Sequence, residues 1–200
     1  MSNTACWNDA KNVNVRTLPK TRLGAWFQTF SGRQFWPMDP RPGDFDIRDI
    51  AHGLANICRF GGHPREFYSV AQHSLFVSYE CPAADRLHGL MHDAPEAYIG
   101  DMVQPFKLFM PAFKRAERKI WAAMCDQFGM AVEIPPSVKQ ADLVALMTER
   151  RDLLGRPPAR WDERFEAVEP IPFGIVSPIS PRAAEVLFLD RFVDLWKNKT

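Results

Sequence analysis

Apolar residues recur at helical spacing along most of the chain. In Asp46–Phe60 they stand at Ile47, Ile50 and Leu54, three or four residues apart, and two glycines follow as a stop signal. The same spacing, with nearby Ser, Gly and Pro signals, predicts further helices. They span Ser69–Tyr79, Asp85–Ala94, Pro111–Phe128, Ser137–Leu154, and Ser180-Pro181 to about Lys197. Few segments alternate in the manner of a strand, so the pattern predicts a mainly α fold.

Serine residues stand where three of these helices should begin. Ser69, Ser137 and Ser180 are each predicted to cap a helix, because a serine hydroxyl accepts from a free backbone N–H. Pro181 suits the first helical position after Ser180.

Three segments fall outside this helical pattern. Residues 1–22 read as an irregular lead-in. Gly32–Gly43 is rich in Pro, Gly and aromatic residues, which predicts an ordered loop or short hairpin. The Pro-rich stretch Pro157–Pro178 should cross the surface.

Length and composition fit one globular domain over residues 1–200, with a core at about 45–155 and a C-terminal extension at 156–200. The chain has 200 residues, 46% of them hydrophobic, which is enough for one substantial core. The formal net charge of +1 argues against stable binding to nucleic acid or to an anionic membrane.

The four cysteines (Cys6, Cys58, Cys81 and Cys125) are widely spaced and form no CxxC pair, so we expect free thiols in a reducing compartment. The N-terminus is polar, and no apolar run is long enough for a membrane span. We therefore expect a soluble, cytoplasmic protein, in a bacterial cell or the cytoplasm of a phage-infected host.

The sharpest chemical signal is the segment LMHDAPEAYIGD, from Leu90 to Asp101. His92 and Asp93 end an apolar helix there, and a divalent metal can satisfy such a pair with both nitrogen and oxygen ligands. His73 and Asp142 each lie within another apolar helix and are the candidates to complete the shell. Each of the four has an ordinary structural explanation when taken alone; together they indicate a metal centre.

Three segments resemble the HD-domain phosphohydrolases: CRFGGHPREFYSVAQHS, LMHDAPEAYIGDMVQPFK and KQADLVALMTERRDL. They are most similar to the small 5′-deoxynucleotidase branch and its phage relatives, which include the phage dATP triphosphohydrolases. The similarity covers roughly residues 45 to 155 and implies an HD-domain helical bundle.

The resemblance implies a metal site at His73, His92, Asp93 and Asp142. The mixed donors suit zinc, cobalt, manganese, nickel or iron. It also implies that Glu96 orients or deprotonates the attacking water together with Asp93. Glu96 and Asp101 are the candidates for a second divalent metal such as magnesium or cobalt.

Substrate contacts are expected from two cations and two aromatic rings. Lys107 and Arg59 could neutralise phosphates, and Phe60 and Trp36 could stack on a base or sugar. Cellular deoxynucleotidases have Trp where Phe60 stands, so the sequence leaves sugar selectivity open.

The expected function is hydrolysis of a deoxynucleotide, with a dNTP, dATP included, cut to nucleoside and triphosphate. Three alternatives remain: a 5′-deoxynucleotidase acting on dNMPs, an inactive HD-fold nucleotide-binding module, and a di-iron oxygenase, which would need more histidine ligands. The resemblance also implies a homo-oligomer, either a dimer or a hexamer.

Overall fold

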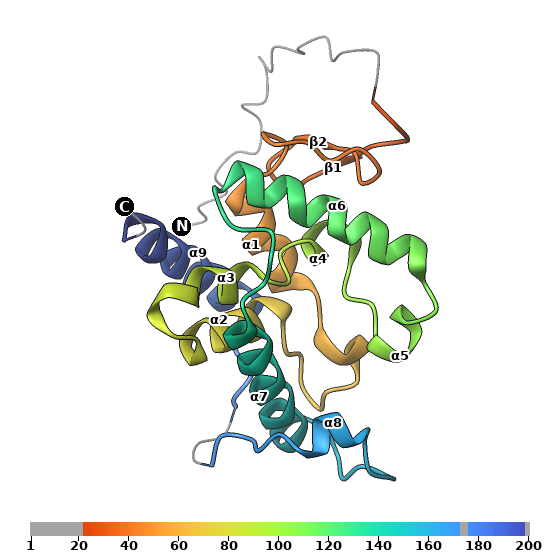
Figure 1. Ribbon diagram of the computed structural model, residues 1–200, viewed down its shortest axis with the longest axis vertical. Coiled ribbons are helices and arrows are strands. Elements are labelled where there is room, and N and C mark those ends of the chain that lie inside the picture. The colour runs from red at the N-terminus through yellow and green to blue at the C-terminus, as the bar shows by residue number, and fades with distance from the viewer. Residues whose placement is uncertain (1–21, 173–175, 199–200) are drawn as a thin grey trace, which may run out of the picture.

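The computed structural model describes residues 22–172 and 176–198, and these residues are mainly helical, as predicted (Figure 1). The predicted lead-in lies outside them except for Arg22. The α-helices are α1 (Ile47–Asn56), α2 (Val70–Glu80), α3 (Arg86–Met91), α4 (Glu96–Ile99), α5 (Gln104–Lys107), α6 (Pro111–Gln127), α7 (Pro136–Leu153), α8 (Glu163–Glu166) and α9 (Pro181–Lys197). Two 3₁₀ turns are η1 (Arg59–Gly62) and η2 (Ala83–Asp85), and the two short strands are β1 (Phe27–Gln28) and β2 (Gln34–Phe35).

The longer predicted helices are confirmed, and two of the three predicted serine caps are present. The Ser69 hydroxyl accepts from the Gln72 N–H, and the Ser180 hydroxyl accepts from the Ala183 N–H. The prediction for Ser137 is wrong, because α7 begins one residue earlier at Pro136. Ser137 therefore lies inside the helix, and its hydroxyl donates to Asp85.

Gly32–Gly43 was predicted as an ordered loop or short hairpin. A short hairpin is present, but it spans Phe27–Phe35, and the rest of the predicted segment is loop. Strands β1 and β2 pair antiparallel, with Phe27 opposite Phe35. The ring of Phe35 is fully buried and packs against Phe45 and Tyr98, which anchors the hairpin to the helical core.

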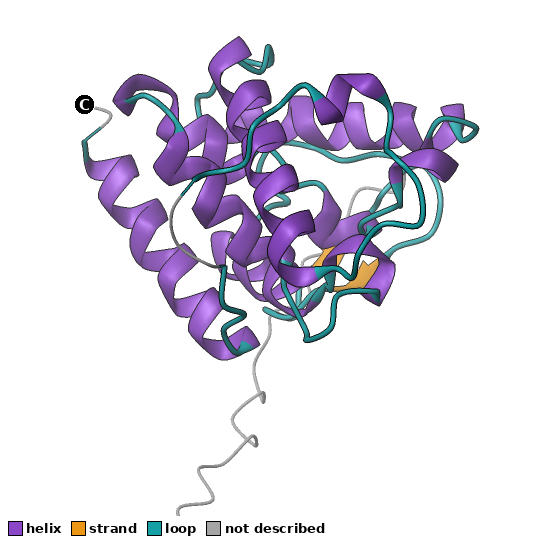
Figure 2. Ribbon diagram, turned by 90° about the horizontal axis from the view of Figure 1, so that it is seen from below, coloured by secondary structure: helices purple, strands orange, loops and turns teal. Residues whose placement is uncertain are grey.

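Helix α2 lies at the centre of the arrangement and packs against α1, α3, α7 and α9. Figure 2 shows the helices crossing one another, with the small sheet to one side. Helix α9 buries Ala184, Phe188 and Phe192 in the same apolar cluster as α1 and α2. The segment predicted as a C-terminal extension thus contributes to the core.

A smaller apolar cluster holds α2 against α7. Val77 of α2 and Cys81, directly after it, pack there with Val138, Ala141 and Ala145 of α7. Burial of such side chains contributes roughly 1.5–3 kcal/mol for one of valine size. The contact fixes the spacing of two helices that each carry a predicted metal ligand.

Glycine allows α3 to approach α2 closely. A Cβ at Gly89 would lie 2.8 Å from the Cys81 sulfur and 3.2 Å from the Ser78 Cα. This close approach places the residues directly after α3 beside the middle of α2.

The structure also contains short helices that the sequence pattern did not predict. Helices α4, α5 and α8 span four residues each. A helix of this length is too short to show a periodic pattern of apolar residues. Helix α8 lies within Pro157–Pro178, whose described residues are mostly exposed, as expected.

Among the described residues, no helix is both long and apolar enough to cross a membrane. Cys58 and Cys81 are free thiols, as expected, and Cys6 lies outside the described part of the chain.

Candidate metal centre

The structure brings the ligand atoms of His73, His92 and Asp93 within 4.8 Å of one another, and the predicted ligand Asp142 lies beside the two histidines. The Nε2 atom of His73 lies 3.1 Å from an Asp142 oxygen and 3.6 Å from an Asp93 oxygen. The Nε2 atom of His92 lies 3.2 Å from the same Asp93 oxygen and 4.0 Å from Asp142. Donor atoms around one transition-metal ion are separated by roughly 3–3.5 Å when each bond is about 2.0–2.2 Å, so this spacing fits a shared ion.

Three parts of the chain supply these ligands. His73 lies in the middle of α2, and Asp142 lies in α7 next to Ala141 of the apolar α2–α7 contact. His92 and Asp93 occupy the turn between α3 and α4 rather than a continuous helix. Leaving the helix there allows two neighbouring residues to face the same point.

Both imidazole rings are oriented with one nitrogen toward the centre. His92 Nδ1 lies 2.8 Å from the Gly89 carbonyl oxygen, and His73 Nδ1 lies 2.7 Å from a Glu149 carboxylate oxygen. Both oxygens only accept, so each Nδ1 carries the proton. Each Nε2 is buried and, among the described residues, lacks a hydrogen-bond partner. Two orphaned nitrogens facing two carboxylates are a donor set that a divalent transition metal satisfies.

At the same point, the acidic and basic side chains shift one another's pKa values. Burial and Arg59 oppose a charge on His73, but Glu149 and Asp142 outweigh them and raise its pKa to about 9. The pKa of Asp93 is lowered despite burial, because His92, His73 and Arg59 stabilise its carboxylate. A cation is therefore favoured where these carboxylates meet.

Behind His73 lies a carboxylate that the sequence analysis missed. Glu149 of α7 is fully buried and has three partners. Besides His73, it accepts from the Tyr68 hydroxyl at 2.9 Å and from Arg59 Nε at 3.1 Å. Arg59 also lies 3.6 Å from Asp93. Glu149 thus joins a predicted metal ligand to a predicted phosphate-binding cation.

Glu96 is a second buried glutamate near the centre, three residues after Asp93 at the start of α4. It is 5% exposed, and its Oε2 has no hydrogen-bond partner among the described residues. Burial and the neighbouring Asp93 and Asp101 raise the pKa of Glu96 well above its usual range. Lys107 is the nearest cation, with its Nζ 3.9 Å from Glu96 and 2.5 Å from Glu117 of α6.

Asp101 lies in the loop after α4, where burial raises its pKa. Within the described residues, the close group of potential metal-ligating atoms comprises His73, His92 and Asp93. Glu96 and Asp101 do not form another such group, so the second metal remains a prediction.

The two predicted stacking residues are placed differently. Phe60 directly follows Arg59, whose guanidinium lies 5.4 Å from the Phe60 ring centre. Its φ of 54° is unfavourable for a bulky residue, a strain of about 1–3 kcal/mol that clusters at functional sites. Trp36 is buried beside the hairpin, and its ring contacts are with Trp26 and Arg22. The structure therefore brings Phe60, and not Trp36, to the Arg59 side of the centre.

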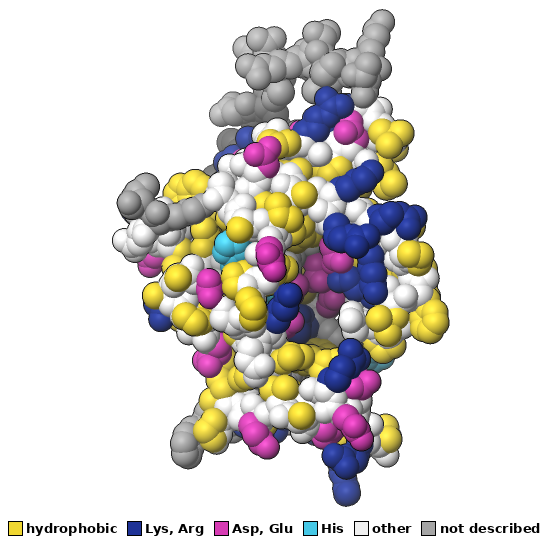
Figure 3. All heavy atoms as spheres, viewed as in Figure 1, with side chains coloured by type: hydrophobic (Ala, Val, Ile, Leu, Met, Phe, Trp, Pro, Cys, Tyr) yellow, Lys and Arg dark blue, Asp and Glu magenta, His cyan; other side chains and the backbone are white. Residues whose placement is uncertain are grey.

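The molecular surface is hollowed next to α6. Figure 3 shows acidic side chains inside this hollow and a gathering of basic side chains along its α6 side. Lys114, Arg115 and Arg118 of α6 have exposed or half-buried side chains. The hollow is thus acidic inside and basic along its α6 side.

The fold and this centre define the chain as a mainly helical domain with a mixed histidine–aspartate candidate metal site. It is 40% identical over 171 residues to YfdR of Escherichia coli strain K12, covering 86% of this chain and 96% of YfdR. It is 35% identical over 161 residues to RCAP_rcc00048 of Rhodobacter capsulatus, covering 74% and 82% of the two chains. The chain belongs to the family of these proteins, both of which are described as uncharacterized. No protein-family model matches it.

Proposed function

We propose that this protein is a metal-dependent phosphohydrolase of the HD type that acts on deoxynucleotides. The favoured reaction cuts a dNTP, dATP included, to nucleoside and triphosphate. The observation that carries the proposal is the meeting of His73, His92, Asp93 and Asp142, with two buried Nε2 atoms that lack partners among the described residues.

His73, His92, Asp93 and Asp142 would hold the ion. When bound, a divalent transition metal would supply positive charge that polarises a phosphoryl oxygen and activates water.

Glu96 is suited to orient water and to accept its proton. Burial and two neighbouring carboxylates disfavour its charged form and raise its pKa, which makes it a stronger base than an ordinary carboxylate. The hydrogen-bond capacity of its Oε2 is unused within the described residues.

Arg59 and Lys107 are suited to neutralise phosphate oxygens on either side of the centre. Arg59 is held by Glu149 and reaches toward Asp93, and Lys107 lies between Glu96 and Glu117. Catalysis would then rest mainly on positioning and charge stabilisation. Phe60 lies beside Arg59 and is the candidate to contact the sugar or base.

A product screen tests the proposal. The full chain would be incubated with each dNTP and each dNMP in the presence of Mn²⁺, Co²⁺, Zn²⁺, Ni²⁺ or Fe²⁺. Released tripolyphosphate supports the favoured reaction, and orthophosphate from dNMPs indicates the alternative 5′-deoxynucleotidase.

Metal content must be measured on the same samples. A protein that binds one of these metals and a nucleotide but releases no product would be an inactive binding module. Oxygen uptake with loss of substrate would favour the alternative that the protein is a di-iron oxygenase. A protein that turns over equally well after chelation would contradict the proposal altogether.

A further inference from the structure

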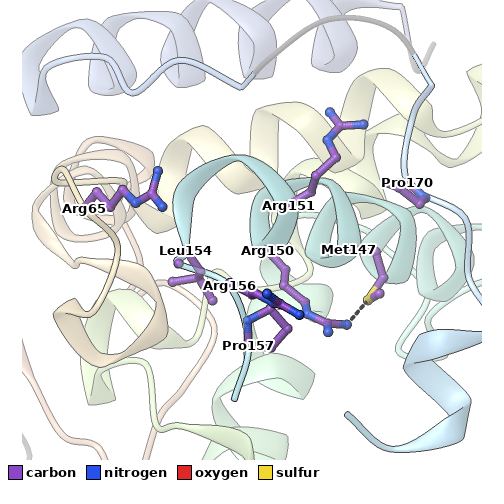
Figure 4. Close-up of a pocket in the computed structure, with 9 residues that line it drawn as sticks. Arg65, Met147, Arg150, Arg151, Leu154, Arg156, Pro157 and Pro170 are labelled. Atoms are coloured by element: carbon purple, nitrogen blue, oxygen red, sulfur yellow. Dashed lines mark hydrogen bonds between the residues drawn. The ribbon is translucent and has the colours of Figure 1, made fainter. Parts of the chain in front are cut away.

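Four arginines line a cavity of about 390 Å³ at the C-terminal end of α7, on a part of that helix distinct from Asp142. Arg150 and Arg151 come from α7, Arg65 from the segment before α2, and Arg156 from the segment after α7 (Figure 4). Arg150 lies eight residues beyond Asp142, which is about 12 Å along the helix axis.

Two of these arginines are fixed in place by their neighbours. Arg150 donates to Glu166 at 2.8 Å and lies 4.5 Å from the Trp161 ring centre. Arg151 donates to Asp152 at 2.7 Å and to the Ile171 carbonyl oxygen. Such contacts reduce the entropy that these side chains would lose on binding a ligand.

The other two arginines carry charge that the described residues do not neutralise. Arg65 and Arg156 are exposed, and neither side chain has an ion-pair or hydrogen-bond partner in the described part of the chain. Arginines in the last turn of a helix are explained by the helix dipole, which accounts for Arg150 and Arg151. It does not account for Arg65 and Arg156, which reach the cavity from outside the helix.

The cavity also has an apolar side. Met147, Leu154, Pro157 and Pro170 line it together with the arginines. An adjoining cavity of about 240 Å³ shares Arg150, Leu154 and Arg156 and extends to Trp161. The larger volume alone is within the range of small-molecule sites, about 300–1,000 Å³.

We propose that this arginine cavity binds a small molecule that carries two or more linked phosphate groups and an apolar part. The phosphates would bridge Arg65 and Arg156, with Arg150 as a pre-oriented third donor. The apolar part would lie against Leu154 and Pro157. This site is separate from the candidate metal centre and does not depend on the proposed hydrolase activity.

An anion bound in the arginine cavity would contact segments of the chain that also carry residues of the metal centre. The Arg65 N–H donates to the Leu153 carbonyl oxygen at 3.0 Å, so the segment that follows Arg59 and Phe60 is already tied to the end of α7. Arg150 directly follows Glu149, which holds His73 and Arg59. An anion joining Arg65 to Arg156 would fasten this segment to α7 more firmly.

The test is a titration of the full chain with inorganic tripolyphosphate, by calorimetry in EDTA so that no metal contributes. We expect one site, with affinity that weakens as salt rises. Arg65→Gln and Arg156→Gln should each weaken binding by about tenfold or more, because each removes a charge-assisted hydrogen bond. Arg182→Gln, which removes an exposed arginine from α9, is the matched control and should leave binding unchanged.

Three outcomes would overturn the proposal. They are no binding, equal binding by the Arg65→Gln/Arg156→Gln double variant, and loss of binding in Arg59→Gln or Lys107→Gln instead, which would place the anion at the metal centre. A second measurement needs no variant: tripolyphosphate should protect Arg65 and Arg156 of the unaltered protein from phenylglyoxal, as mapped by mass spectrometry. Equal labelling with and without the anion would likewise count against the site.

Discussion

Glu149 and Glu96 are both buried carboxylates beside the same cluster of histidines and aspartates, yet their surroundings are opposite. Glu149 accepts from His73, Tyr68 and Arg59, and the charges of Arg59 and His73 lower its pKa despite complete burial. Glu96 has one oxygen without a partner among the described residues, and its pKa is raised.

The difference in surroundings distinguishes a carboxylate that holds other side chains in place from one that can react. A buried carboxylate whose bonds are satisfied fixes the orientation of its partners, whereas one with unused capacity is costly unless a ligand or proton supplies what is missing. We therefore assign Glu149 to positioning and Glu96 to contact with water. Four predictions test that division.

The largest effect is expected at the point between the two glutamates. His92→Ala or Asp93→Ala should abolish turnover and metal retention together, a loss of at least about 10³-fold in kcat/KM, since several kcal/mol of charge stabilisation disappear. Metal content by mass spectrometry and product release would be measured on the same samples. Asp126→Ala, an exposed change on α6, serves as the control, and full activity of a metal-free Asp93→Ala protein would refute the assignment.

Glu96→Gln should lower kcat by about 10²–10⁴-fold, because the amide cannot accept the proton of water. Metal content should stay unchanged, and the melting temperature should not fall, because a buried carboxylate that lacks a partner on one oxygen is removed. Kinetics and metal analysis of the same preparation check this. Loss of metal in parallel with kcat would instead make Glu96 a ligand.

The contrast also explains what the sequence could and could not predict. His73 and Asp142 stand out because each interrupts an apolar helix face. His73 is fully buried in the structure, whereas the Asp142 side chain is 41% exposed. Glu149 lies in the run Glu149-Arg150-Arg151-Asp152, which is typical of a solvated helix surface. Its position seven residues after Asp142, two turns on the same face, was the signal that could have revealed it.

Other differences have equally local causes. Phe60 was predicted as an aromatic ring that could stack on the substrate, but its left-handed backbone is not encoded by periodicity. Trp36 was predicted for the same reason, and only tertiary packing shows that Arg22 and Trp26 contact its ring. The spacing of residues along the chain cannot predict which side chains from distant segments contact each other.

Glu149→Gln should weaken metal binding by about 10–100-fold, the usual effect of removing a partner that orients a ligating histidine. The free energy of unfolding in EDTA should fall by about 3–5 kcal/mol, because Arg59 loses its buried partner charge. Competition with a chromophoric chelator and urea melts provide the two measurements. Tyr68→Phe removes only one hydrogen bond, so it should cost about 1 kcal/mol and leave metal affinity unchanged. Equal metal affinity in Glu149→Gln would reduce Glu149 to a purely structural role.

The smallest effect is expected at Lys107, on the Glu96 side. Its Nζ lies 2.5 Å from Glu117, so much of its charge is already neutralised before an anion arrives. Lys107→Met should therefore raise KM by only about tenfold and change kcat less. Glu117→Gln should have the opposite sign: it frees the ammonium group for the substrate and lowers KM. Initial-rate kinetics at fixed metal concentration would compare the two variants, and a rise in KM for both would mean that the Lys107–Glu117 pair serves to hold α5 against α6.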